Sequence, residues 1–142
     1  MRRSTAAVVL TAWVAFLLDM TLRWLPGDTP PPPNLVPFAM IAHDWHAGGR
    51  SFVVNLVGNV VAFIPVGVLL PLARKRGASL LLIAASCAGL SAAIEVAQFA
   101  TGRRVGDVDD VLLNTAGGLL GYAILGVYRS ARPQSSGARG RA

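Results

Sequence analysis

Four apolar segments, each about as long as a membrane crossing requires, constrain this chain more than any other feature. They run from Ala6 to Leu22, Ser51 to Ala73, Ala78 to Thr101 and Val108 to Tyr128. A helix needs about 20 mostly apolar residues to cross the hydrocarbon core, and a backbone in lipid must satisfy its own hydrogen bonds. We therefore expect an all-α fold, an integral membrane bundle of four transmembrane helices.

Composition and charge agree with a membrane protein. Of the 142 residues, 54% are hydrophobic and 14% are charged, against about 25% charged in an ordinary soluble domain. The net charge is +6, but the cations form short clusters between apolar segments, so we expect lipid and no nucleic acid as the partner. The single cysteine, Cys87, lies in an apolar segment and is interpreted as a small core residue.

The chain divides into three parts. Residues 1–50 are expected to hold an uncleaved signal-anchor helix and a Pro-rich extracytoplasmic loop, because no small-x-small cleavage site follows the first segment. In that loop Phe38, Ile41 and Trp45 recur at helical spacing, which predicts a short helix on the membrane surface. Residues 51–128 form the helical core, and residues 129–142 are expected to be a disordered basic tail.

The cations also predict an orientation. Three clusters fall on one side of a four-helix topology: Arg2 and Arg3; Arg74, Lys75 and Arg76; Arg129, Arg132, Arg139 and Arg141. The other side holds Arg23, Arg50, Arg103 and Arg104. The positive-inside rule places both termini in the cytoplasm.

Polar residues of the last three segments are predicted to meet at one depth. At about 1.5 Å per residue, all of them fall in the outer half of the bilayer, and ionisable groups there usually face a bundle interior or a polar cavity. The set is Asn55, Asn59, Glu95, Gln98, Asp110 and Asn114, with Asp107 at the start of the last segment.

Structural roles compete with functional ones for these residues. Asn55 and Asn59 could act as interhelical glue, and Gly117-x-x-x-Gly121 indicates close helix packing. Glu95 could form a structural ion pair with Arg104 or Arg103. Asp107 could cap the last helix, whereas Asp109 is interpreted as a solvated turn residue.

The sequence gives no strong sign of a metal or cofactor. Glu95, Asp107 and Asp110 carry oxygen ligands suited to Mg²⁺ or Ca²⁺, but their spacing does not require a metal, and we expect none. The group His43-Asp44-x-His46 is interpreted as surface polar residues beside an interfacial tryptophan. We expect no cofactor.

Two motifs make the chain similar to a known family. The second segment reads Asn-Leu-Val-Gly-Asn-Val-Val-Ala-Phe-Ile-Pro-Val-Gly from Asn55. The later stretch has Glu95 and Gln98, then Arg104, Asp107, Asp109, Asp110, Asn114, Gly117, Gly118 and Gly121. Together they resemble the VanZ-like family, over about Asn55 to Tyr122. Gly106 departs from the family's pattern, which often has a bulky residue there.

The resemblance implies a multi-pass protein of the bacterial plasma membrane, linked to resistance against teicoplanin-type glycopeptides. With the depth argument, it leads to the hypothesis that an outward-facing polar pocket binds or modifies a lipid-linked cell-envelope component. Glu95 and Asp110 are the candidate catalytic residues. The candidate ligand-binding residues are Asn55, Asn59, Gln98, Arg104, Asp107 and Asn114.

Two alternatives stay open at this point. The protein could be a small membrane enzyme acting on lipid head groups, or a structural partner subunit of an envelope complex. Whether it is an enzyme, and whether it forms a homo-oligomer, does not follow from the sequence. A solo transporter is disfavoured, because the inner half of the bilayer lacks polar residues to line a pathway.

Overall fold

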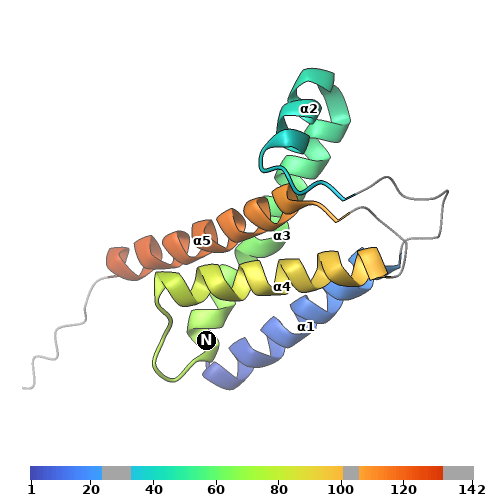
Figure 1. Ribbon diagram of the computed structural model, residues 1–142. Helices are drawn as coiled ribbons and strands as arrows, with labels where there is room; N and C mark the ends of the chain where they lie inside the picture. Colours follow the sequence, from blue (N-terminus) through green and yellow to red (C-terminus); the bar gives the residue numbers. More distant parts are fainter. Residues whose placement is uncertain (24–32, 101–105, 133–142) are drawn as a thin grey trace, which may run out of the picture.

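A computed structural model describes residues 1–23, 33–100 and 106–132. Five helices are found in these ranges: α1 (Arg3–Leu22), α2 (Ala39–Ala47), α3 (Gly49–Ala73), α4 (Leu80–Ala100) and α5 (Val108–Ala131). All but α2 are long and apolar enough to cross a membrane. The expected all-helical class with four candidate membrane spans is therefore confirmed (Figure 1).

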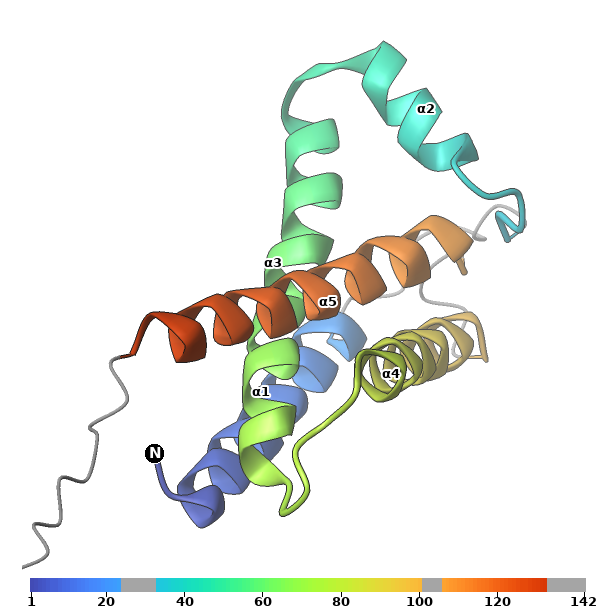
Figure 2. The same ribbon diagram turned by 90° about the vertical axis from the view of Figure 1, so that its left-hand side faces the viewer.

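The predicted segments match the helices to within a few residues. α3 continues through Pro65 and Pro71. The short helix expected around Trp45 is α2, which stands beside the first turns of α3, away from the body of the bundle (Figures 1 and 2). The end of α1, the end of α4 and the start of α5 lie at one end of the bundle (Figure 1).

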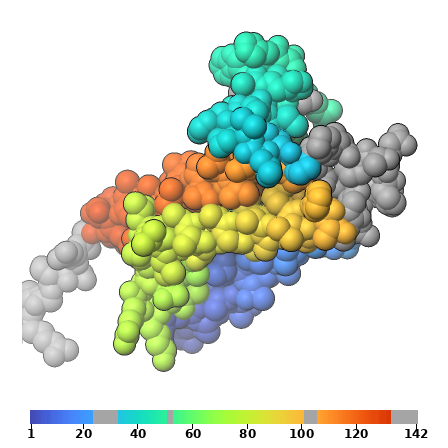
Figure 3. Space-filling view, in the orientation of Figure 1, coloured from blue at the N-terminus to red at the C-terminus, as the bar shows by residue number. Residues whose placement is uncertain are grey.

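Helix α5 lies against both α3 and α4, and the space-filling view shows it directly along α4 (Figure 3). It crosses α3 steeply (Figure 2). At that crossing a Cβ atom on Gly117 would overlap the Val60 carbonyl oxygen, and one on Gly121 would overlap that of Ile64. The predicted close-packing role of this glycine pair is confirmed, since only a bare backbone fits there.

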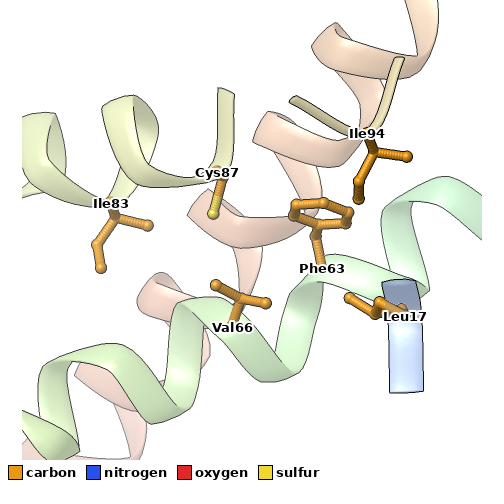
Figure 4. Close-up of a cluster of buried hydrophobic side chains, with 6 residues drawn as sticks. All are labelled: Leu17, Phe63, Val66, Ile83, Cys87 and Ile94. Carbon is orange, nitrogen blue, oxygen red and sulfur yellow. The ribbon is translucent and has the colours of Figure 1, made fainter. Parts of the chain in front are cut away.

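The apolar core lies where α1, α3 and α4 meet. Its buried members are Leu17, Phe63, Val66, Ile83, Cys87 and Ile94 (Figure 4). Cys87 is fully buried, which confirms it as a core residue. The Trp13 indole N–H donates to the Ala62 carbonyl at 2.9 Å, so α1 is held to α3 by a hydrogen bond as well as by apolar packing.

Candidate functional site

Glu95 connects α4 to the turn that begins α5. Its Oε2 accepts a hydrogen bond of 2.8 Å from the backbone N–H of Asp107. The Asp107 carboxylate in turn accepts from the Asp109 N–H at 2.9 Å, and Asp107 is the N-cap of α5. The capping role considered for Asp107 is therefore confirmed, because its oxygen satisfies an N–H that the first turn leaves unpaired.

A distant segment is attached to the same turn through Asn34. Its side-chain amide donates to Asp107 Oδ1 at 2.8 Å. Its backbone N–H donates to the Gly106 carbonyl at 2.9 Å, and its carbonyl accepts from the Val108 N–H at 3.1 Å. These bonds form a one-residue parallel bridge between Asn34 and Asp107, so the chain around residue 34 is fixed beside the start of α5.

Asp109 is buried at the start of α5, with only 1% of its surface exposed. The expectation that it would be a solvated turn residue is therefore wrong. Its carboxylate accepts from the backbone N–H groups of Phe38, Met40 and Ile41 at 2.5, 2.9 and 3.1 Å. These are N–H groups at the start of α2, which a helix cannot satisfy internally and which favour a negative charge. Asp109 therefore holds α2 onto α5.

Three further polar contacts join the long helices. The Asn59 amide donates to Asp110 Oδ1 at 2.5 Å, linking α3 to α5. The Asn114 amide donates to Ser91 Oγ at 2.7 Å, linking α5 to α4. The Gln98 amide donates to the Thr21 carbonyl at 3.1 Å, linking α4 to α1. The four long helices therefore meet through polar side chains at one level.

These side chains surround a small cavity of about 40 Å³. Its polar lining is Thr21, Asn59, Glu95, Gln98, Asp110 and Asn114. The buried Asn114 Oδ1 has no hydrogen-bond partner among the described residues. A buried amide oxygen without a partner is uncommon, and a cavity of this size can hold one or a few waters or the tip of a ligand. The cavity is thus suited to a small hydrogen-bond donor.

A larger groove of about 330 Å³ lies next to this cavity, between α4, the start of α5 and the segment around residue 34. Apart from two carboxylate residues, its lining is apolar or glycine. The lining residues are Pro33, Leu35, Ala92, Glu95, Val96, Phe99, Gly106, Asp107, Val108 and Val111. Glu95 lines both spaces, so the polar cavity and the apolar groove share one carboxylate.

Not every predicted site residue lines the polar cavity of about 40 Å³. Asn55 donates instead to Asp44 of α2 at 2.8 Å, and it lines a separate cavity of about 20 Å³. Asp107 borders the groove. Arg104 and Arg103, the two cations considered as ion-pair partners of Glu95, lie outside the described residues. Asn59, Glu95, Gln98, Asp110 and Asn114 are brought together.

The histidines of the His43-Asp44-x-His46 group lie away from the cavity on α2. His43 Nδ1 is 3.5 Å from Asp44 Oδ1, and the His43 side chain is exposed. Within residues 1–23, 33–100 and 106–132, no group of three or more His, Cys, Asp or Glu side chains is arranged to hold a metal ion.

Comparison with known proteins identifies the family. The family model described as VanZ/LLP1 matches residues 5–129, which extends well beyond the stretch that carries the two sequence motifs. Comparisons with curated proteins and with solved structures gave no match. The family match covers four apolar helices that suit a multi-pass membrane protein. The chain therefore belongs to the VanZ/LLP1 family.

Proposed function

We propose that this protein binds or modifies a lipid-linked component of the bacterial cell envelope, and that this activity lowers sensitivity to teicoplanin-type glycopeptides. The polar cavity lies in the outer half of the plasma membrane, and both termini lie in the cytoplasm. Residues 1–50 anchor the protein and cover the outer end, residues 51–128 form the working core, and residues 129–142 form a basic tail. Family membership supports the membrane setting.

One observation carries the proposal: Glu95 lines both the polar cavity and the apolar groove. A lipid-linked ligand has a polar head and a hydrocarbon chain, and it needs two such surfaces side by side. Polar groups inside a membrane helix are costly, so natural chains rarely keep them without a use.

The charge pattern supports the orientation. Within the described ranges, Arg2 precedes α1 and Arg3 is its first residue. Arg74, Lys75 and Arg76 lie between α3 and α4. Arg129 is in the last turn of α5. These cations belong to the end of the helices away from Glu95, and the positive-inside rule assigns that end to the cytoplasm.

The contacts suggest a role for each residue. Asn59 orients Asp110. The Glu95 carboxylate and Asn114 Oδ1 accept hydrogen bonds from hydroxyl or amino groups of the ligand. Gln98 fixes the end of α4 against α1. Arg104 would meet phosphate or carboxylate, because a guanidinium suits both.

The differing surroundings of two carboxylates favour an enzyme as the second candidate. Asp110 is 9% exposed and is hydrogen-bonded to Asn59, whereas Glu95 is less buried and borders the open groove. Two carboxylates in unlike environments can divide the roles of acid and base. Turnover of the ligand, measured beside binding, distinguishes this candidate from a pure binding protein.

The test is binding of a polyprenyl-diphosphate-linked cell-wall precursor to the full chain in lipid nanodiscs. Glu95→Gln keeps an oxygen that can accept from the Asp107 N–H but removes the charge. We expect it to bind about tenfold more weakly, since losing a charge-assisted hydrogen bond costs at least about 1.4 kcal/mol. Asp19→Asn is the matched control, because Asp19 pairs with Arg23 outside the cavity. Equal binding by all three proteins contradicts the proposal, and a lower abundance of Glu95→Gln without a binding defect indicates a structural subunit.

A further inference from the structure

The polar cavity of about 40 Å³ is lined by side-chain amides from α3, α4 and α5. In each of these amides the amino group donates a hydrogen bond to another group of the protein. The bonds run from Asn59 to Asp110 Oδ1, from Gln98 to the Thr21 carbonyl and from Asn114 to Ser91 Oγ. The Thr21 hydroxyl likewise donates to the Leu17 carbonyl at 2.7 Å. Each described donor group of the lining is therefore engaged within the protein.

Oxygen atoms are the groups that the lining offers to a ligand. Asn114 is only 7% exposed, and its Oδ1 is buried without a hydrogen-bond partner among the described residues. The carboxylates of Glu95 and Asp110 line the same space, and an ionised carboxylate can only accept hydrogen bonds. No Lys, Arg or His within residues 1–23, 33–100 and 106–132 lines the cavity. The wall is therefore built from acceptors.

A wall of acceptors distinguishes between the hydrogen-bond donors that a ligand can carry. A hydroxyl group or a water molecule donates, but each also brings lone pairs that need a donor in the wall. A buried polar group without such a partner is costly. A protonated primary amine has three N–H donors and no lone pair, so it leaves none of its own groups unsatisfied. Its positive charge is also favoured beside carboxylates.

The size of the cavity fits an ammonium group. A space of about 40 Å³ holds one or a few water-sized groups, which is enough for an ammonium group and too little for a sugar or a phosphate. Mg²⁺ and Ca²⁺ take about six or more oxygen ligands. The part of the chain that the structure describes has no cluster of acidic, histidine or cysteine side chains arranged for a metal ion.

We propose that the polar cavity binds a protonated primary amine of the ligand's head group, with Asn114 Oδ1 and the carboxylates of Glu95 and Asp110 as its acceptors. This inference rests on the proposed function and adds to it the chemical class of the group that enters the cavity. Two sources carry such a group: a lipid-linked cell-wall precursor with a free amine in its head group, and phosphatidylethanolamine.

Two substitutions at one position test the acceptor. Asn114→Leu removes the unpartnered oxygen while keeping a side chain of similar size, whereas Asn114→Asp keeps an oxygen at the cavity. The matched control is Thr115→Val. Thr115 is the next residue of α5 and does not line the cavity, and its hydroxyl donates within its own helix to the Val111 carbonyl.

The experiment titrates the full chain in detergent micelles and measures bound lipid by native mass spectrometry. One pair of probes is a polyprenyl-diphosphate-linked precursor with a free amine and the same precursor with that amine acetylated. The other pair is phosphatidylethanolamine and phosphatidylcholine, whose nitrogen is charged but has no N–H. The readout is the ratio of the two dissociation constants within each variant, so a variant that folds less well is its own reference.

We expect the wild type and Thr115→Val to bind the free amine about tenfold or more tightly than the acetylated form. Acetylation removes the charge and leaves a single N–H, and the loss of a charge-assisted hydrogen bond weakens binding by about that factor. Asn114→Asp should keep this preference. In Asn114→Leu the preference should fall about threefold or more, because one of the acceptors is missing.

The outcomes separate this inference from the proposed function. Equal binding of the free and the acetylated precursor by the wild type overturns the ammonium site and leaves the proposed function in place. A preference for the amine that Asn114→Leu retains in full also overturns the site. If neither form of the precursor binds, the proposed function fails and the phospholipid pair decides the inference. A preference for phosphatidylethanolamine that Asn114→Leu loses then supports the site with phospholipid as the source, and equal binding of both phospholipids overturns it.

Discussion

The Asn59 amide and the Asp110 carboxylate form a 2.5 Å hydrogen bond that joins α3 to α5. It lies at the polar cavity, on the same helix pair that Gly117 and Gly121 bring into backbone contact. The close approach of the α3 and α5 backbones allows the short Asn59 and Asp110 side chains to reach each other. Without the glycines the two helices would be too far apart for this hydrogen bond.

We predict a measurable coupling between Asn59 and Asp110. Hydrogen bonds to charged groups contribute roughly 1.5–3 kcal/mol, above the average of about 0.6 kcal/mol for polar pairs in membrane proteins. A double-mutant cycle with Asn59→Ala and Asp110→Ala, measured by reversible unfolding in detergent micelles, should give a coupling of about 1–2 kcal/mol. Asn55→Ala with Asp110→Ala is the control and should be additive, because Asn55 donates to Asp44 instead.

The glycines at the crossing should tolerate no side chain. Gly117→Ala and Gly121→Ala place a Cβ against the carbonyl oxygens of Val60 and Ile64, so α3 and α5 must separate. We expect a large loss of thermal stability and membrane abundance, by roughly 2 kcal/mol or more. Gly126→Ala, on the same helix, has open space around it and should behave as wild type. Equal losses of stability in Gly117→Ala and Gly126→Ala would contradict the close packing of α5 against α3.

Removing the Asp109 carboxylate should release α2. Asp109→Ala leaves the N–H groups of Phe38, Met40 and Ile41 without their acceptor, which we expect to destabilise the fold by roughly 2–4 kcal/mol. Limited proteolysis should cut residues 33–47 faster than in the wild type. Asp19→Ala removes an exposed ion pair with Arg23 and should cost under about 1 kcal/mol. A proteolysis rate unchanged in Asp109→Ala would refute the role of this residue in holding α2.

The orientation can be tested by cysteine labelling in intact cells. His46 in α2 and Ser79 before α4 are both exposed, and the native Cys87 is buried. A membrane-impermeant maleimide should label His46→Cys in intact cells and Ser79→Cys only after permeabilisation. The reverse pattern would place the polar cavity in the cytoplasmic half and remove the basis of the proposed function.

Features with a local pattern could be predicted from the sequence. Long apolar runs predict the spans, and the spacing of Gly117 and Gly121 predicts their packing. The meeting of Asn59, Glu95 and Asp110 at one level of the bundle follows from counting residues along helices, because the rise of a helix is fixed.

Side-chain contacts whose partners lie far away in the chain could not be predicted from the sequence. Nothing near Asp109 indicates that its carboxylate accepts from amides about 70 residues earlier, so a turn exposed to solvent was the natural expectation. Asn34 gave no signal at all, since it follows a Pro-rich run without helical or strand periodicity. Asn55 shares a helix face with Asn59, but its hydrogen-bond partner is Asp44 of α2. The position of α2 depends in turn on Asp109.

The role of the polar cavity is tested most directly by the teicoplanin susceptibility of a sensitive bacterial host that expresses the wild type, Glu95→Gln or Asp19→Asn, with membrane abundance measured in parallel. We expect the wild type and Asp19→Asn to protect the host, whereas Glu95→Gln, at equal abundance, should not. Equal protection by Glu95→Gln would contradict the claim that the cavity around Glu95 is the functional site.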